Sequence, residues 1–383
     1  MAQELRVGTS LAPPYQTKTG ANISGSVVDL IRCALDSKGT DYTLSVVPWK
    51  RATNSLVSRK LDIIFSFTEN AELDKAAQFS TPLVLEKWYW YSESGADHKD
   101  KSVSVVVVLG SNQEGWLQTQ GYVNIKSVSS IENAMKMLST GRAKVLLTDQ
   151  RLAAQSAKRM GKDIGSLKAN FSRFSTLGAY ISRDYLKANP VFLKSFNKSI
   201  LDCKPVGITL DETTRAVLAD VASNIQTWLR VSLVGDSVER ANKKHLSITN
   251  QEIISLDKQW RAEAKTNARP LIEETLGNEL SVYLKQVKKE HGGLYSEIFI
   301  MDQHGLNVGQ SDVTSDYWQG DEGKFQKSFG ANTKQPFVDA IEYDESSQSF
   351  QSQISLTIFD AGGETPIGAI TVGVNVEKAL DKQ

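Results

Sequence analysis

The chain has 383 residues, and at roughly 150 residues per domain this length indicates two or three folded units. Lys and Arg number 44 and so do Asp and Glu, so the net charge is zero, which argues against non-specific nucleic-acid binding because that needs surplus cations. Apolar residues make up 40% and charged residues 23%, which is typical of a folded chain. The longest apolar run, Val103–Leu109, is far shorter than the roughly 20 residues of a membrane-spanning helix.

The cysteines and histidines indicate no metal site. Cys33 and Cys203 permit at most one disulfide and exclude a zinc site of four cysteines. The histidines show no metal-binding spacing; they are His98, His245, His291 and His304. No phosphate-binding loop or dinucleotide-binding glycine motif stands between a predicted strand and a helix. The sequence therefore predicts neither a metal nor a cofactor.

The first part of the chain alternates strands and helices. Strands are predicted at residues 5–9, 44–47 and 61–65, and helices at 25–35 and 51–59, where apolar residues recur three and four positions apart. This order predicts parallel strands with helices on both faces of the sheet.

A second series of the same kind follows an extended aromatic segment at residues 88–91. It comprises a valine-rich strand at 103–109, a helix at 131–138 and a strand at 145–147, after which the chain returns at 178–182. Two α/β lobes joined by two extended crossovers form a hinged clamp, and ligands bind such folds at the carboxyl ends of the strands.

The chain changes in character beyond Pro205. Val217, Val221, Ile225 and Leu229 recur every fourth residue and predict a long amphipathic helix. Further helices are predicted at 252–264 and 271–288. Two hairpins then follow, one from 296 to 308 and one from 350 to 376, each with glycine in its turn. Helices followed by antiparallel strands indicate an α+β domain.

Residues 4–204 resemble the family 3 bacterial extracellular solute-binding proteins. The resemblance rests on ordered pieces, namely Val7-Gly8-Thr9 with Pro13-Pro14-Tyr15, Gly25–Leu30, Pro48–Ala52, Lys60–Phe65, Phe79–Pro82 and Leu147–Asp149. It implies an α/β two-lobed clamp in residues 1–205, with lobe 1 at about 4–88 and 183–205 and lobe 2 at about 92–178. It also implies an extracytoplasmic, periplasmic protein whose signal peptide has been removed, although a cytosolic chain could begin in the same way.

Several side chains follow strand ends that face the predicted cleft. Tyr15 and Trp49 have aromatic faces that can wall a ligand, with ordinary core packing as the alternative. Ser66, Thr68 and Glu69 follow one strand, and helix capping is the alternative for the hydroxyls. Ser111 opens a helix whose free amides attract an anion. Asp149 ends a strand, and the resemblance implies that it holds a ligand ammonium group.

One departure from the family concerns the ligand carboxylate. Amino-acid binders of this family usually carry an arginine six residues before the Phe-Ser pair, and here that position is Leu73. Arg51 could replace it, with an exposed helix arginine as the alternative. An amine or an amino-acid derivative therefore stands beside a plain amino acid as the predicted solute.

Residues 206–383 resemble extracellular sensory domains of the PAS-like Cache type, with long helices first and a sheet core at about 294–380. The pieces are Tyr295–Asp302, Gly305–Val308, Ser311–Glu322 and Pro366–Val374. The resemblance implies a pocket covered by residues 314–325, in which Tyr317 and Trp318 wall the site and Asp316 or Asp321 meets a cation. A closed structural loop is the alternative.

Taken together, these patterns predict a binding and sensory protein rather than an enzyme. The predicted partners are a small polar solute and either a membrane permease or a membrane receptor. The alternative is the substrate-binding component of an ABC importer with an added regulatory module. A dehydratase that uses a cleft carboxylate, such as Glu69, as general acid is a further alternative. A third reading is the ectodomain trimmed from a membrane receptor.

The two cysteines leave two readings open. In the resembling family the helix before Cys203 packs back near the first lobe, which contains Cys33, so a disulfide is one reading. Two separate thiols that pack as small apolar side chains are the other.

Overall fold

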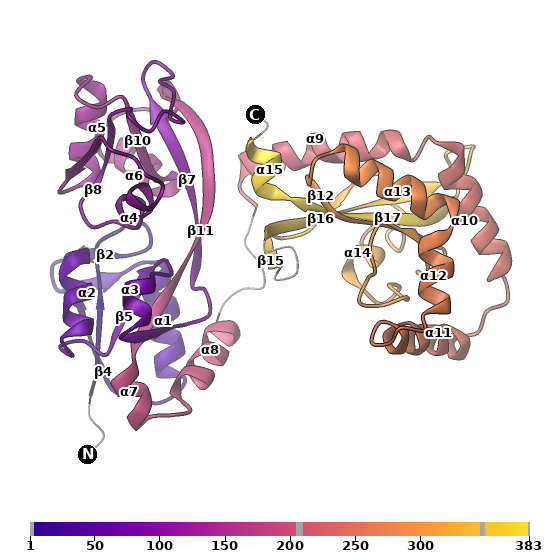
Figure 1. Cartoon of the computed structure of the whole chain (residues 1–383), viewed down its shortest axis with the longest axis horizontal. Helices are drawn as coiled ribbons and strands as arrows, with labels where there is room; N and C mark the ends of the chain where they lie inside the picture. The colour runs from indigo at the N-terminus through magenta and orange to yellow at the C-terminus, as the bar shows by residue number, and fades with distance from the viewer. Residues whose placement is uncertain (1–3, 204–209, 345–348, 382–383) are drawn as a thin grey trace. The chain divides into compact units, whose positions relative to one another are not determined.

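The computed structural model describes residues 4–203, 210–344 and 349–381, which form two compact units that divide between residues 206 and 207 (Figure 1). Unit 1 contains the strand and helix series of the two predicted lobes, and unit 2 contains the long helices and the antiparallel hairpins.

Lobe 1 of unit 1 is built on parallel strands. β1 (Leu5–Thr9) lies between β4 (Tyr42–Val46) and β5 (Ile63–Phe67) and pairs in parallel with both. The helices α1 (Ser26–Asp36) and α2 (Trp49–Val57) connect them. Apolar residues of α1 such as Val28 and Ile31 are fully buried, so the predicted α/β pattern of this lobe is confirmed.

Lobe 2 repeats the arrangement. β8 (Val105–Val108) pairs in parallel with β9 (Ile125–Val128) and with β10 (Val145–Asp149). Its helices are α4 (Asn112–Thr119), α5 (Ile131–Ser139) and α6 (Gln150–Arg159). The carboxyl ends of the strands lead into α4 and α6, so Ser111 and Asp149 each lie at the junction of a strand and a helix.

Two long antiparallel strands join the lobes. β7 (Val84–Ser92) pairs with the first part of β11 (Lys168–Ser182), and the last part of β11 pairs with β5 of lobe 1. β7 in turn pairs with β10 of lobe 2. The sheet therefore runs continuously in the order β4-β1-β5-β11-β7-β10-β8-β9, and Figure 1 shows β7 and β11 side by side along unit 1.

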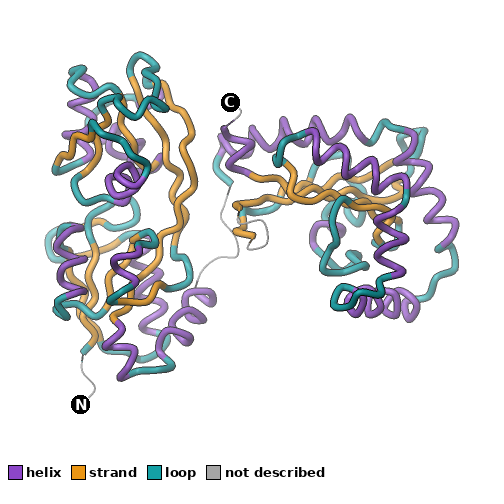
Figure 2. The backbone as a smooth tube through the Cα atoms, viewed as in Figure 1, coloured by secondary structure: helices purple, strands orange, loops and turns teal. Residues whose placement is uncertain are grey.

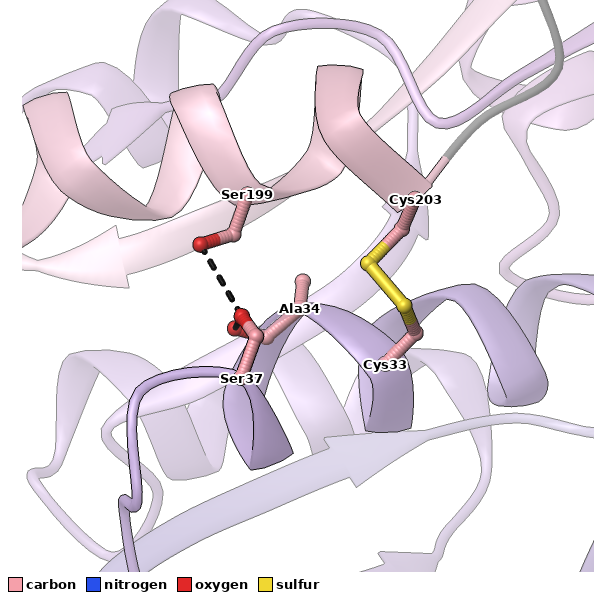
Figure 3. The surroundings of a disulfide bond; sticks show 5 residues. All are labelled: Cys33, Ala34, Ser37, Ser199 and Cys203. Carbon is pink, nitrogen blue, oxygen red and sulfur yellow. Dashed lines mark hydrogen bonds between the residues drawn. A yellow bond between two sulfur atoms is a disulfide. The ribbon is translucent and has the colours of Figure 1, made fainter.

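A disulfide closes lobe 1. Cys33 of α1 and Cys203, the last residue of α8 (Phe192–Cys203), are joined, with 6.1 Å between their α-carbons. Figure 3 shows that Ser37 and Ser199 of the same two helices also meet, with their hydroxyl oxygens 3.2 Å apart. The first reading of the cysteines is thus confirmed, and α8 packs against α1 as the resemblance implied.

The helices of unit 2 begin with α9 (Glu212–Trp228), α10 (Ser232–Lys244) and α11 (Asn250–Glu263). The single helix predicted at 271–288 is wrong, because the chain forms α12 (Pro270–Gly277) and α13 (Glu279–Glu290). Asn278 separates them: its ψ of 162° leaves the helical region, and its side chain caps α13 by accepting from the Ser281 amide.

The strands of unit 2 form one antiparallel sheet. Its order is β13-β12-β17-β16-β14, and β15 pairs with β16. The strands are β12 (Tyr295–Asp302), β13 (Asn307–Gln310), β14 (Phe337–Val338), β15 (Glu342–Asp344), β16 (Ser349–Phe359) and β17 (Pro366–Asn375). Both predicted hairpins are confirmed by the pairing of β12 with β13 and of β16 with β17. The helices α9, α10 and α13 contact its strands, and Figure 2 shows helices packed along one face of the sheet.

Short elements complete the two units. In unit 1 they are β2 (Thr17–Thr19), β3 (Asn22–Ser24), α3 (Ala71–Asp74), β6 (Ala77–Phe79), the 3-10 turn Ile164–Ser166 and α7 (Arg183–Ala188). In unit 2 they are α14 (Gly323–Gln326) and α15 (Val376–Asp381).

Candidate functional site

A cavity of about 810 Å³ lies between the lobes of unit 1. Lobe 1 contributes Thr53 and residues 67–73, and lobe 2 contributes residues 110–112, 114–116, 118 and 119 in and before α4. The joining strands contribute Trp88 from β7 and Arg173, Ser175 and Thr176 from β11. A cavity of this size at the carboxyl ends of parallel strands is where a clamp of this fold would hold a small ligand.

Tyr15 of lobe 1 and Asp149 of lobe 2 contact each other, and neither is among the residues that line this cavity. The Tyr15 hydroxyl donates a hydrogen bond of 3.2 Å to Oδ1 of Asp149, and both side chains are buried. Asp149 also accepts from the backbone amides of Leu152, which it caps at the start of α6, and of Lys87 on β7. Burial raises the pKa of Asp149, while the two amides oppose that shift.

Ser66 and Thr68 contact lobe 2 through Asn112. The Asn112 side chain donates to the Ser66 carbonyl and accepts from the Thr68 amide, each at 3.3 Å. Gln16 donates to the Ser66 hydroxyl. Ser66 has a φ of 70°, in the left-handed region that few residues other than glycine adopt. Such strained backbone positions cluster at ligand-binding sites.

The remaining candidates of lobe 1 lie nearer the surface. Trp49 packs edge-on against Phe67, which lines the cavity, with ring centroids 4.9 Å apart. Glu69 lines the cavity and is exposed. Arg51 is exposed on α2, and Leu73, at the position of the family's arginine, is buried.

The anion expected at Ser111 is supplied by the chain itself. Ser111 caps α4 by accepting from the Glu114 amide, and the Glu114 carboxylate accepts a hydrogen bond from the Gly110 amide. The positive end of α4 therefore already holds a carboxylate. Ser111 still lines the cavity, so its hydroxyl remains a candidate ligand contact.

Sequence reasoning missed Glu86. This side chain of β7 is 5% exposed, and its Oε2 accepts from the Trp88 indole at 2.7 Å and from the Gln113 amide at 3.4 Å. Burial, together with the charge of Asp149, raises the pKa of Glu86 from 4.5 to about 8. The available signal was a glutamate within a strand of apolar and aromatic residues.

Arg173 adds a cation to the cavity wall. Its guanidinium lies 6.0 Å from the Trp88 ring and 5.8 Å from the Trp116 ring, and all three residues line the cavity. The wall thus combines aromatic faces with hydroxyl, amide, carboxylate and guanidinium groups, which suits a small polar molecule.

The candidate residues of unit 2 lie in a loop that hydrogen bonds and an ion pair hold in place. Asp257 of α11 accepts from the backbone amides of Tyr317 and Trp318, and Arg261 pairs with Asp316 at 3.1 Å. The Trp318 indole donates to the His304 carbonyl, whereas Asp321 is exposed.

The candidate residues of unit 2 are not gathered in either of two cavities that its described residues line. Tyr317 lines one of about 580 Å³, which Arg240 and Lys244 of α10 also line. The other cavity, of about 520 Å³, is lined by polar residues of β12, β15 and β16.

A comparison with known protein families agrees with the two-lobed fold of unit 1. Residues 5–259, more than half of the chain, match the family of bacterial extracellular solute-binding proteins, family 3, and the match continues into α11 of unit 2. No curated protein matches the chain. Within the described residues, no helix is long and apolar enough to cross a membrane.

Many solved structures are similar to about half of the chain, among them the following three. The arginine-, lysine-, histidine-binding protein ArtJ from Geobacillus stearothermophilus is 20% identical with a TM-score of 0.44, covering 52% of this chain and 89% of its own. The GluR0 ligand-binding core from Nostoc punctiforme, in complex with L-glutamate, is 21% identical with a TM-score of 0.44, covering 52% and 92%. An ancestral amino acid-binding protein, a precursor of cyclohexadienyl dehydratase, is 23% identical with a TM-score of 0.42, covering 52% and 88%.

Proposed function

Since the chain belongs to the bacterial extracellular solute-binding proteins, family 3, we propose that unit 1 binds a small polar solute, an amine, an amino acid or a derivative, between its lobes. The supporting observation is the cavity of about 810 Å³ that both lobes and both joining strands line. Polar contacts already cross from one lobe to the other, from Asn112, which lines the cavity, to Ser66, and from Tyr15 to Asp149. A solute that bridges the lobes would strengthen this closed arrangement.

A thermal-shift screen of amines, amino acids and derivatives tests the binding. A solute at 100 times its dissociation constant raises the free energy of unfolding by about 2.7 kcal/mol, and the melting temperature of unit 1 rises with it. Asn112→Ala, which removes the contacts to Ser66 and Thr68, is expected to weaken the shift. The matched control is Asn133→Ala, because Asn133 is exposed on α5 and bonds to Ser129 within lobe 2. If a solute raises the melting temperature of Asn112→Ala as much as that of the wild type, the solute binds elsewhere.

We further propose that this binding is reported as a signal and that no turnover occurs. The support is unit 2, whose antiparallel sheet follows long helices as in the Cache-like domains that it resembles. A transport receptor needs the clamp alone. Mass analysis of each bound solute before and after long incubation is expected to show no change, and a new product mass would indicate catalysis.

A substrate-binding component of an ABC importer is the second candidate, favoured by the two-lobed clamp itself. The Cys33–Cys203 disulfide supports a periplasmic location for either role, because disulfides persist in oxidising compartments. Deletion of the gene separates the two roles. Loss of solute uptake would favour import, whereas normal uptake with loss of the transcriptional or motile response to the solute would favour sensing.

A further inference from the structure

A cavity of about 580 Å³ in unit 2 lies among α10, α12, α13 and β13. Its walls combine apolar side chains, among them Leu271, Leu280 and Val308, with the polar side chains of Asn307 and Arg240. It shares no lining residue with the cavity between the lobes of unit 1. Largely apolar walls with a few polar groups are typical of sites for small molecules.

Asn307 of β13 brings to this cavity a buried acceptor without a donor. Asn307 is 2% exposed, and its side-chain nitrogen donates to the Thr314 hydroxyl at 2.9 Å and to the Asp316 carbonyl at 3.1 Å. Because a carbonyl only accepts, this end of the amide must be the nitrogen. The other end, Oδ1, has no hydrogen-bond partner among the described residues. A buried acceptor without a donor is costly, so a ligand that donates to Oδ1 is favoured.

A hydroxyl group suits this acceptor better than an ammonium group does. A hydroxyl brings one donor for the one unpaired atom, whereas an ammonium brings three donors and a charge that is costly to bury. Thr275 and Tyr317, which line the same cavity, are also buried and carry hydroxyl groups rather than carboxylates. The buried part of the wall therefore favours an uncharged donor.

Arg240 of α10 supplies a cation to the same cavity. It is exposed, and its guanidinium donates to the Ser237 hydroxyl on the preceding turn at 2.9 Å. Within the described part of the chain it forms no ion pair with a carboxylate. The planar guanidinium matches a carboxylate in geometry and can bind both of its oxygens.

The other charged groups of the wall leave Arg240 as the group that an anion meets. Lys244 pairs with Glu274 at 3.4 Å, and His245 pairs with the buried Asp302 at 2.6 Å. The remaining acidic side chain is exposed in the first turn of α13, where the positive end of the helix offsets its charge.

We propose that this cavity binds a small hydroxy carboxylate with an apolar chain, whose hydroxyl donates to Oδ1 of Asn307 and whose carboxylate pairs with Arg240. Leu271, Leu280 and Val308 contact the chain of the ligand. The site is built from unit 2 alone, so it goes beyond the proposed function of unit 1 and does not depend on the solute held between the lobes.

Calorimetric titration of the full chain with three matched probes tests this inference. The binding probe is α-hydroxyisocaproate, which has a branched apolar chain. Isocaproate lacks its hydroxyl, and α-hydroxyisocaproamide lacks its charge. Each of these changes is expected to weaken binding by about tenfold or more, because Asn307 or Arg240 is left without its partner.

A variant of the exposed Arg240 tests the anion contact without disturbing the core. Arg240→Gln is expected to weaken the binding of α-hydroxyisocaproate by about tenfold or more. Lys243→Gln is the matched control, because Lys243 is exposed on the same helix, carries the same charge and does not line the cavity. Its affinity for the probe is expected to stay within about twofold of the wild type, since salt screens exposed charges.

Hydrogen exchange locates the bound probe. Saturating α-hydroxyisocaproate is expected to protect backbone amides of α10 and β13, whereas protection of residues 110–119 alone would place the probe in unit 1. Equal losses in Arg240→Gln and Lys243→Gln would reduce the effect to general electrostatics. Equal affinities for isocaproate and α-hydroxyisocaproate would show that Asn307 does not select the ligand. Each of these results, like the absence of binding by all three probes, overturns the inference while the proposed function of unit 1 stands.

Discussion

The hydroxyl of Tyr15 donates a hydrogen bond of 3.2 Å to the carboxylate of Asp149, and these residues lie 134 positions apart in the chain. Tyr15 follows β1 of lobe 1, and Asp149 stands between β10 and α6 of lobe 2. This buried contact joins the two lobes, in addition to the contacts of Asn112 with Ser66 and Thr68. A change at this contact alters both the stability of unit 1 and the separation of its lobes.

Tyr15→Phe removes this hydrogen bond while it keeps the ring. The free energy of unfolding is expected to fall by about 1 kcal/mol, because one contact between the lobes is lost. The ligand-free lobes are expected to separate more for the same reason. Denaturant unfolding measures the first effect and small-angle scattering the second. Tyr122→Phe is the control, since its hydroxyl donates to His98 within lobe 2. Equal scattering from the two variants would show that the Tyr15 contact does not hold the lobes together.

The pH dependence of stability is expected to depend on Glu86. Its pKa is raised from 4.5 to about 8 in the folded chain, so folding favours the protonated form. The stabilisation is present in full below about pH 4.5 and is lost as the pH rises to about 8. Between pH 5 and pH 8 the wild type is therefore expected to lose at least about 1.4 kcal/mol of unfolding free energy relative to Glu86→Gln.

Asp149, Trp88, Gln113 and the Tyr15 phenol surround Glu86, and only the carboxyl groups titrate below pH 8. Ser175→Ala is the control, because Ser175 pairs with Glu86 on the neighbouring strand and carries no titratable group. Urea unfolding at successive pH values gives the comparison. Parallel pH profiles for the wild type and Glu86→Gln would contradict the raised pKa.

The sequence predicts the lobes well because their apolar patterns are local. The apolar run Leu61–Phe65 is expected to be buried in any fold, and it leads into β5, which is buried along its whole length. The break at Asn278 is different, because Leu276, Leu280 and Leu284 keep a four-residue spacing across it, which a continuous helix would also show. Local periodicity fixes which face is buried but not where the backbone departs from the helix.

The candidate site depends on contacts between distant residues. Tyr15 and Asp149 can be selected one at a time from strand ends, but the sequence does not indicate that they bond to each other. Glu86 was missed because a single charged residue in a strand is commonly an outward-facing one. Its burial follows from the position of β7 between β10 and β11, which is a property of the whole sheet.

Substitution of Asp257 tests whether residues 314–325 form a structural loop. Its Oδ1 accepts from the amides of Tyr317 and Trp318, and its Oδ2 accepts from Arg261. Asp257→Ala leaves two amides without their acceptor and is expected to destabilise unit 2 by about 2–4 kcal/mol. Thermal unfolding followed by tryptophan fluorescence measures the change. Asp316→Ala, which removes a more exposed pairing with Arg261, is expected to cost less than about 1 kcal/mol. If the two variants lose the same unfolding free energy, the Asp257 carboxylate is not the contact that stabilises this loop.

The disulfide between Cys33 and Cys203 is expected to stabilise unit 1 strongly. The two residues are 170 positions apart, so the bond restricts the unfolded chain over most of unit 1. Chain-entropy reasoning gives about 4–5 kcal/mol for a loop of this length. The double variant Cys33→Ser/Cys203→Ser is therefore expected to unfold at a markedly lower denaturant concentration, while Ser37→Ala/Ser199→Ala, which removes the neighbouring hydroxyl contact, changes it little. Alkylation of denatured protein that has not met a reductant should label no cysteine. Two labelled cysteines would contradict the bond and remove the support that it gives to an oxidising location.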